Sequence, residues 1–280
     1  MVISPHKVVV VSYRLTSMRY AGRVNQEAIA YGFSVAVPGK TLRTVNDAIE
    51  AFIVEHDCRP AFKDYQPIGA KSPFPAAACI SPNDVVVHGI PGDYVLQPAD
   101  LLTIDVGAEY KGWYVDSARS SIIPCSTIAS ETELKKAKQG AYLIEATDAI
   151  LNAQLAIICH GCTLMELVDV SERVAKEYGI TIMAQWGGHQ IGDKIHMDPF
   201  IPSAIDRKQS YLKQMLDAKK YTRQQLLEGQ TICIEPVTAF GTDVITIDAD
   251  QWTVRKQDGL LAAHTERCLL VTKNGYELLS

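Results

Sequence analysis

Gly39-Lys40-Thr41-Leu42 has a counterpart later in the chain, Gly161-Cys162-Thr163-Leu164. In both copies a glycine turn leads to a threonine suited to capping a helix, and an amphipathic stretch follows. A longer helical segment precedes each copy, at about 17–33 and 130–159. Capping boxes at Ser130 with Glu133, and in the second copy at Thr163, support two of these helix starts. The echo predicts two related halves, each beginning with a pair of helices.

Strand-like runs follow each pair of helices. They occupy residues 77–88, 101–109, 113–120, 230–237, 242–248 and 266–271. The order of two helices and then strands therefore occurs twice, at about 15–122 and 130–275, which predicts an α+β fold of two pseudo-symmetric halves with helices on one side of curved antiparallel sheet. Because no Pro/Gly/Ser-rich linker divides the chain, we predict a single catalytic domain over residues 1–280.

Composition narrows the class of protein. The 280 residues are 47% apolar and 21% charged, as in a soluble globular protein, and the formal charge of -5 argues against DNA or an acidic membrane as the partner. No apolar run is long enough to span a membrane, and the N-terminus does not resemble a secretory signal. Seven irregularly spaced cysteines favour the reducing cytoplasm. Cys159 and Cys162 form a CxxC without a second pair, so we expect a structural role for them.

Two aspartates lie on either side of an expected hairpin turn near Lys111–Gly112. A turn centred at 110.5 or at 111.5 places Asp105 opposite residue 116 or residue 118, so Asp105 and Asp116 share one face in either register. Neighbouring carboxylates repel each other, and a divalent cation would remove that conflict. A solvated hairpin face would remove it too, so this pair leaves both readings open.

Three further residues are candidates for the same site. His189 lies in the glycine-rich run 187–192. Glu235 ends a predicted strand in which Ile232 and Ile234 share one face, and Glu266 precedes an apolar strand. A buried glutamate needs a cation, and Arg267 cannot supply it because adjacent strand residues face opposite ways. Taken singly, each of the three is also compatible with a structural role.

Together the candidates supply four carboxylates and one imidazole. Two divalent ions would balance the four negative charges, so the set predicts a dinuclear site. Oxygen-rich ligation with one nitrogen suits Mn, Fe(II), Co or Zn. Such a site supports attack by a metal-bridging hydroxide on a carbonyl that the second metal polarises.

Five features in this order resemble those of the type I methionine aminopeptidases, which have the pita-bread fold. They are Asn83–Pro91, the aspartates eleven residues apart, His189 and His196 seven apart, Ile234-Glu235-Pro236, and Glu266 before its strand. The resemblance covers nearly the whole chain. It implies a cytoplasmic enzyme that removes the initiator methionine from nascent proteins when the second residue is small. We expect it to act as a monomer.

The resemblance also implies a role for individual residues. It implies metal binding by Asp105, Asp116, His189, Glu235 and Glu266, with Glu235 also handling the proton of the attacking water. It implies that His88 and His196 contact the substrate peptide and stabilise the transition state, and that Phe74, Cys79 and Trp252 surround the methionine side chain.

Several positions depart from the family pattern. Gln190 replaces a glycine beside His189, so we expect its side chain to intrude next to that ligand. Ile195 replaces a phenylalanine before His196, and Phe74 replaces a pocket tyrosine. We expect these changes to alter the shape of the pocket and the turnover, while the ligand set is retained.

Residues 203–229 are longer than the minimal type I pattern and are locally basic. Within 207–223 the net charge is +5, from Arg207, Lys208, Lys213, Lys219, Lys220 and Arg223 against Asp217. A solvated helical insert accounts for this excess, and a contact with ribosomal RNA near the peptide exit is the alternative.

Two rival functions share parts of this pattern. A proline-directed aminopeptidase or prolidase could use the same five ligands, and a binding protein could keep the fold after losing catalysis. Because all five ligands and both histidines are present, the sequence favours the methionine enzyme. Cleavage of Met-Ala-Ser against Ala-Pro-Ala peptides with added Mn or Co distinguishes the three.

Overall fold

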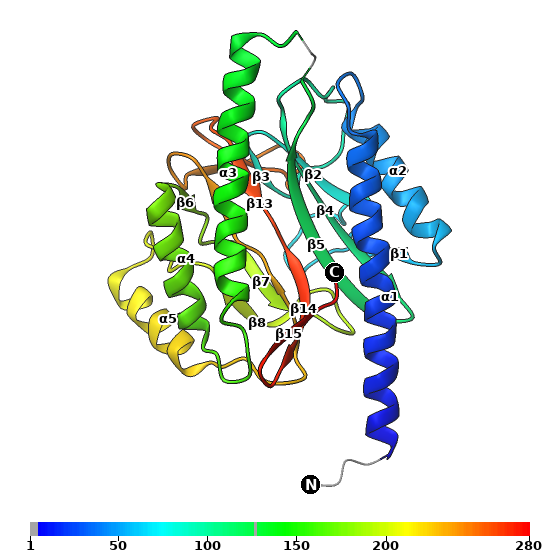
Figure 1. Cartoon of the computed structure of the whole chain (residues 1–280), viewed down its shortest axis with the longest axis vertical. Coiled ribbons are helices and arrows are strands. Elements are labelled where there is room, and N and C mark those ends of the chain that lie inside the picture. Colours follow the sequence, from blue (N-terminus) through cyan, green and yellow to red (C-terminus); the bar gives the residue numbers. More distant parts are fainter. Residues whose placement is uncertain (1–4, 126–127) are drawn as a thin grey trace.

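In Figure 1 one pair of helices (blue) stands on the right and the other (green) on the left, with strands visible between them. The structure is a computed structural model that describes residues 5–125 and 128–280. The helices are α1 (Pro5–Val35), α2 (Leu42–Glu55), α3 (Glu131–Leu155), α4 (Leu164–Tyr178) and α5 (Tyr211–Arg223). The predicted helix pairs are confirmed, with two boundary errors: α1 begins at Pro5 and not near residue 17, and α3 ends at Leu155 and not near 159. Among the described residues, no helix is both long and apolar enough to cross a membrane.

The predicted caps explain where three of these helices begin. The side chains of Thr41, Ser130 and Thr163 each accept a hydrogen bond from the backbone N–H three residues later. The capping boxes of Ser130 with Glu133 and of Thr163 with Glu166 are both complete. The sequence repeat of Gly39–Leu42 and Gly161–Leu164 therefore corresponds to a structural repeat, because its two threonines cap α2 and α4.

Over residues 5–125 and 128–280, the strands pair antiparallel in four sheets. In the first half, β4 (Leu101–Tyr110) pairs with β1 (Arg59–Pro60), β2 (Ala78–Pro82) and β5 (Trp113–Ile122). In the second half, the strand order is β15 (Gly275–Leu278), β14 (Arg267–Thr272), β9 (Thr231–Ile234), β7 (Gly187–Gln190) and β8 (Met197–Pro202). The two small sheets consist of β13 (Ala262–His264), β10 (Val237–Ala239) and β6 (Thr181–Ile182), and of β11 (Ile245–Ile247), β12 (Val254–Lys256) and β3 (Val85–Val87).

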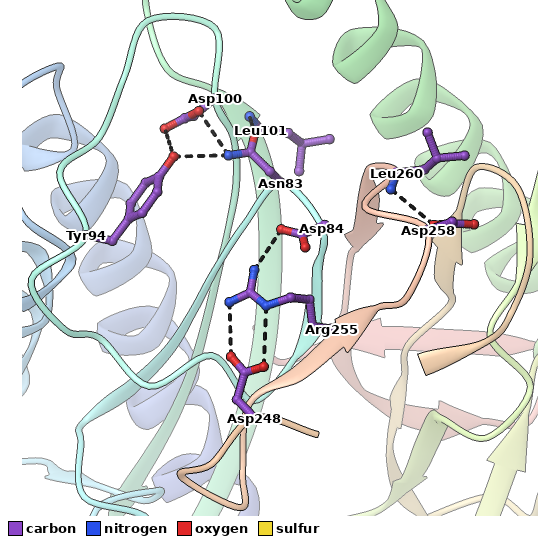
Figure 2. Close-up of polar contacts among 9 residues, drawn as sticks. All are labelled: Asn83, Asp84, Tyr94, Asp100, Leu101, Asp248, Arg255, Asp258 and Leu260. Carbon is purple, nitrogen blue, oxygen red and sulfur yellow. Dashed lines mark hydrogen bonds and ion pairs between the residues drawn. The ribbon is translucent and has the colours of Figure 1, made fainter. Parts of the chain in front are cut away.

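The predicted strand 77–88 was wrong, because a turn at Asn83 divides it into β2 and β3. Asn83 has a φ of 54°, and its amide donates to Asp100 Oδ1 at 3.0 Å and to the Tyr94 hydroxyl at 3.2 Å (Figure 2). Asparagine tolerates this left-handed conformation better than most residues do. The turn redirects the chain, so that β3 pairs with β12 of the second half and no longer continues alongside β4.

Further contacts join the two halves near the strands that carry the candidate ligands. Ala118 in β5 and Glu266 exchange backbone hydrogen bonds of 3.4 and 3.0 Å. The C-terminal segment packs on α1 so closely that a Cβ at Gly22 would lie 1.6 Å from the Leu279 carbonyl oxygen. Glycine is therefore required there. These contacts fix β5 against the beginning of β14.

Candidate metal centre

The β4–β5 hairpin places two aspartates side by side. Asp105 pairs with Ala118 and Asp116 pairs with Gly107, which corresponds to the predicted turn centre of 111.5. The two aspartates are therefore diagonal neighbours on one face of the hairpin. Both are buried, with 8% of Asp105 and 3% of Asp116 exposed, so the solvated hairpin face is excluded.

The second half brings the histidine and two glutamates to the same point. His189 lies in β7 beside β9, Glu235 directly follows β9, and Glu266 directly precedes β14. His189 Nε2 is 4.0 Å from Asp116 Oδ2 and 3.9 Å from Glu266 Oε1. Its Nδ1 lies 3.1 Å from the carbonyl oxygen of Gln190. Donation from Nδ1 to this carbonyl leaves the Nε2 lone pair directed at the carboxylates, which is the tautomer that a metal ligand requires.

The carboxylates carry more charge than their surroundings compensate. Burial, followed by the charge of Glu266, raises the pKa of Asp116 well above its ordinary value. Burial, followed by the charge of Asp105, raises the pKa of Glu235, and burial with Glu235 raises that of Glu266. Burial also lowers the pKa of His189 to about 3, so at neutral pH its imidazole is uncharged and supplies no compensating charge.

Three carboxylate oxygens in this cluster have no partner. Oδ1 of Asp105, Oδ1 of Asp116 and Oε1 of Glu266 are buried without a hydrogen bond to any part of the chain that the structure describes. One ligand atom each from Asp105, Asp116 and Glu266 lies within 4.8 Å of the others, and so do those of Asp116, His189 and His196. A divalent cation would satisfy these oxygens, so the donor set fits metal binding.

A cavity of about 70 Å³ opens at the candidate ligands. All five line it, together with the other residues predicted for the site: His88, His196, Phe74, Cys79 and Trp252. The rings of Phe74 and Trp252 meet edge to face with centroids 5.3 Å apart, and those of His88 and Trp252 lie 6.2 Å apart. Burial lowers the pKa of His88 to about 4, which keeps its ring neutral at neutral pH.

Two aromatic residues in the wall were missed by sequence reasoning. Phe62 and Tyr65 also line the cavity, and the Tyr65 hydroxyl lies 3.0 Å from His196 Nδ1. Both belong to the irregular segment between β1 and β2, which is held in place partly by the hydrogen bond from Ala61 N to Gly107 O. No local motif marks these residues, because this tertiary contact is what brings the segment to the site.

A buried histidine close to the aspartates was also missed. His264 is fully buried, with Nε2 3.8 Å from Asp105 Oδ2 and Nδ1 3.2 Å from the Val86 carbonyl oxygen. Its position two residues before Glu266 was the available signal, since residues i and i+2 of an extended segment share a face. Its place behind Asp105 makes it a neighbour of the site outside the lining of the cavity.

The family departures lie further from the cavity than predicted. Gln190 turns to Gln230, whose amide donates to it at 3.2 Å, and it is not among the residues that line the cavity. The expectation that it intrudes beside His189 was therefore wrong, because adjacent strand residues face opposite ways. Ile195 is buried against Gly107 and lies outside the cavity lining, whereas Phe74 does form part of the wall.

Comparison with known proteins supports the resemblance. The sequence pattern of Metallopeptidase family M24 matches residues 16–273. A methionine aminopeptidase from Mycoplasma capricolum is 31% identical over 267 residues, which cover 95% of this chain and 95% of that protein.

Solved structures give the same picture of the fold. The crystal structure of a methionine aminopeptidase from Thermotoga maritima matches with a TM-score of 0.80 at 28% identity, covering 100% of this chain and 98% of the other. A prolidase from Pyrococcus furiosus has a TM-score of 0.64 at 20% identity, with 95% of this chain and 63% of the prolidase covered, and this likeness shows the fold alone. The predicted pita-bread fold and the resemblance to methionine aminopeptidases are confirmed.

Proposed function

This chain belongs to metallopeptidase family M24, and on that premise we propose that it removes the N-terminal methionine from polypeptides whose second residue is small. The observation that carries the proposal is the convergence of four buried carboxylates and one imidazole on a single cavity. The two rival functions, a proline-directed peptidase and a binding protein, make different use of the same cavity.

We propose that Asp105, Asp116, His189, Glu235 and Glu266 hold two divalent metal ions. The three carboxylate oxygens without a partner support this assignment. Mn, Fe(II), Co and Zn all suit these donors. Bound there, the metals would polarise the scissile carbonyl and make a water acidic enough to attack it at neutral pH.

The remaining steps fall to side chains of the chain itself. Glu235, which lines the cavity, is the proposed base that takes a proton from the attacking water and passes it toward the leaving amine. His88, neutral at neutral pH, can donate a hydrogen bond to the substrate backbone. His196 is held by Tyr65 with its ring 4.5 Å from that of His189, which suits a contact with the developing negative charge.

The wall of the cavity favours methionine as the first residue. Phe74 and Trp252 present aromatic rings, and Cys79 contributes a sulfur. Thioether sulfur makes favourable contacts with aromatic rings, and an unbranched side chain can enter a narrow cavity. A charged or β-branched first residue would leave a buried charge or meet the walls.

A peptide assay tests the proposal directly. Protein loaded with Mn or Co should release methionine from Met-Ala-Ser and leave Ala-Pro-Ala intact. Cleavage of Ala-Pro-Ala alone would instead identify a proline-directed peptidase. Binding of metal without cleavage of either peptide would favour the binding protein.

We further propose that α5 and its flanking residues contact the ribosome, in the cytoplasm where nascent chains emerge. Three basic side chains of this segment are already paired: Arg207 with Glu172, Lys208 with Asp243, and Lys213 with Asp217. The charge available to a polyanion therefore comes mainly from the end of α5, where Lys219, Lys220 and Arg223 lie.

Reversing Lys219 and Lys220 together to Glu should weaken co-sedimentation with ribosomes at low salt. Reversing Lys135 and Lys138 on α3 in the same way provides the matched control, since both are exposed. If the two double variants co-sediment equally, α5 is a solvated helix without a ribosome contact, and this proposal is wrong.

A further inference from the structure

Two open hollows adjoin the cavity that the five candidate ligands line, here called the metal cavity, and each offers a polypeptide substrate a path away from it. The aromatic hollow, of about 410 Å³, is lined by Trp186, Gly187, Met197, Asp198 and Phe200, among others. The basic hollow, of about 390 Å³, is lined by Arg59, Lys63, Lys194, Asp64 and Asp193, among others. The methionine side chain occupies the metal cavity itself in the proposed function, so the rest of the chain needs a separate path.

The path to the basic hollow runs past a hydrogen-bonded pair of side chains. This hollow shares Tyr65 and His196 with the metal cavity. The hydroxyl of Tyr65 lies 3.0 Å from His196 Nδ1, and the two ring centroids are 5.1 Å apart. A substrate that extended into the basic hollow would therefore pass this hydrogen-bonded pair, which holds His196 in place.

The aromatic hollow, by contrast, opens directly on the reacting groups. It shares His88, His189, His196 and Glu235 with the metal cavity. A scissile bond placed between Glu235 and the two substrate-contacting histidines therefore has its leaving amine at the mouth of the aromatic hollow.

The register of β7 and β8 directs Phe200 toward this hollow. Phe200 pairs with His189, and residues directly opposite in an antiparallel pair project from the same face. Gly187, two residues before His189, leaves room for the ring, since a Cβ there would lie 3.1 Å from Phe200 Cζ. Phe200 is nevertheless 36% exposed, so part of its ring has no protein contact.

Trp186 forms a second aromatic wall and is firmly held. Its indole packs against the buried cluster that contains Val87 and Met183, and its backbone N–H donates to the Met183 carbonyl at 3.0 Å. The indole is half-buried and also lines the hollow. One side of the ring is thus anchored in the core while the other remains available to a ligand.

We propose that Trp186 and Phe200 form a binding subsite for the third residue of the substrate, with a preference for aromatic or large apolar side chains. The inference rests on the proposed function and deepens it. The second residue follows the scissile bond and lies beside His88 and Glu235, which line both the metal cavity and the aromatic hollow. The third residue, roughly 3.3 Å further along an extended chain, is the first that can turn its side chain into the aromatic hollow.

The test compares Trp186→Ala with the wild-type enzyme on three methionine substrates: Met-Gly-Trp-Gly, Met-Gly-Gly-Gly, and a methionyl arylamide that lacks a third residue. The wild type should favour the Trp peptide over the Gly peptide. In the variant, KM for the Trp peptide should rise about tenfold, corresponding to about 1.4 kcal/mol, while kcat and arylamide hydrolysis stay near wild type. Lys194→Ala, in the basic hollow, is the matched control and should change none of these values.

The subsite is wrong if Trp186→Ala keeps the wild-type preference for Trp, or if Lys194→Ala is the variant that raises KM. If Trp186→Ala impairs hydrolysis of the arylamide as much as that of the Trp peptide, Trp186 has a structural role, and the proposed subsite is also wrong. Should Trp186→Ala fail to fold, Phe200→Ala at the more exposed wall must show the same selective rise in KM. Failure of the wild type to cleave any methionine substrate would refute the proposed function and this inference with it, whereas loss of the subsite alone leaves arylamide cleavage intact.

Discussion

Asp100 and Asp116 are both buried aspartates of the first half, yet their surroundings differ completely. Asp100 is 0% exposed and accepts hydrogen bonds from Asn83, Tyr94 and the backbone N–H of Gln97 at 2.8–3.0 Å. Figure 2 shows the first two of these contacts. Lys136 from α3 completes the set with an ion pair of 2.6 Å. Every part of this carboxylate is satisfied by the protein.

Asp116 is almost as deeply buried, but its neighbours are other acids. Burial, followed by the charges of Glu266, Asp105 and Glu235, raises its pKa, and its Oδ1 has no partner within the described residues. A carboxylate that the chain itself neutralises stabilises the fold, as Asp100 does by joining α3 to the first half. One that the chain leaves uncompensated must bind a proton or a metal cation from solution. The contrast separates structural from functional acids without any reference to sequence motifs.

The largest expected effect follows from removing an uncompensated acid. Asp105→Ala should lower kcat/KM by on the order of 10³-fold or more, since a lost metal ligand costs several kcal/mol of barrier at about 1.4 kcal/mol per factor of ten. The variant should also bind less metal, measured by elemental analysis after dialysis. Near-normal turnover in this variant would contradict the metal centre.

Removing the compensated acid should affect stability and spare the chemistry. Asp100→Ala removes the partner of the Lys136 ammonium and of three other donors, and should lower the free energy of unfolding by about 3 kcal/mol. Asp93→Ala is the control, because Asp93 is largely exposed in its pair with Arg43 and should change stability by about 0.5 kcal/mol at most. Urea denaturation measures both. If Asp100→Ala folds but loses its metal, the division between Asp100 as a structural acid and Asp116 as a functional acid is wrong.

A change at His88 should impair catalysis without affecting metal binding. His88→Ala removes a group proposed to touch the peptide, so kcat should fall roughly 10²-fold while the metal content stays at the wild-type level. If the metal is lost with the imidazole, His88 is a ligand and the proposed division of roles is wrong.

The uncompensated acids should also give the metal-free protein an unusual dependence on pH. Because the pKa values of Asp116, Glu235 and Glu266 are raised by folding, the native state binds more protons than the unfolded state above the ordinary carboxyl range. The stability that they confer is therefore fully present at acid pH and is lost as the pH rises through their raised pKa values.

Denaturation in chelator over a series of pH values measures this effect, and comparison with Asp116→Asn separates it from the titration of histidines and of the buried thiols, whose pKa values burial also raises. The free energy of unfolding should fall as the pH rises above the ordinary carboxyl range, and it should fall less in Asp116→Asn. Saturating metal should abolish the decline, because bound ions compete with the protons. A flat profile without metal would mean that the acids are compensated after all.

The smallest effect concerns the pocket for the first residue. One methylene or a sulfur in an apolar pocket is worth about 1–3 kcal/mol, so norleucine should replace methionine with a modest loss in kcat/KM. Leucine should be released slowly, and lysine should not be released. Gly, Ala and Ser should be accepted as the second residue, and Leu refused. A peptide panel that varies both positions measures this, and efficient release of lysine would refute the assignment of the pocket.

Much of this architecture was predictable because it depends on local chemistry. The caps at Ser130 and Thr163 are set by residues three positions apart, and the hairpin of Asp105 and Asp116 by a turn and an alternation of period two. In the same way, the glycines of the run 187–192 predicted a loop or bent strand near the site, and His189 in β7 lines the cavity.

What escaped prediction depends on distant contacts. The break at Asn83 is stabilised by Asp100 and Tyr94, and the strand after it pairs with residues about 170 positions away. Tyr65 reaches His196 through an irregular segment that carries no periodicity. The direction in which Gln190 points follows from strand alternation and could have been predicted, had 187–190 been identified as a strand.

The most direct test of the account is to count the metal ions that the cluster binds. Equilibrium dialysis of chelator-treated protein against Mn or Co, followed by elemental analysis, should give two ions per wild-type chain. The same measurement on Asp100→Ala should also give two ions, and on Asp116→Asn fewer. Wild-type protein that binds no divalent metal, or an Asp116→Asn variant that binds as many ions as the wild type, would contradict the claim that these uncompensated acids form the catalytic metal centre.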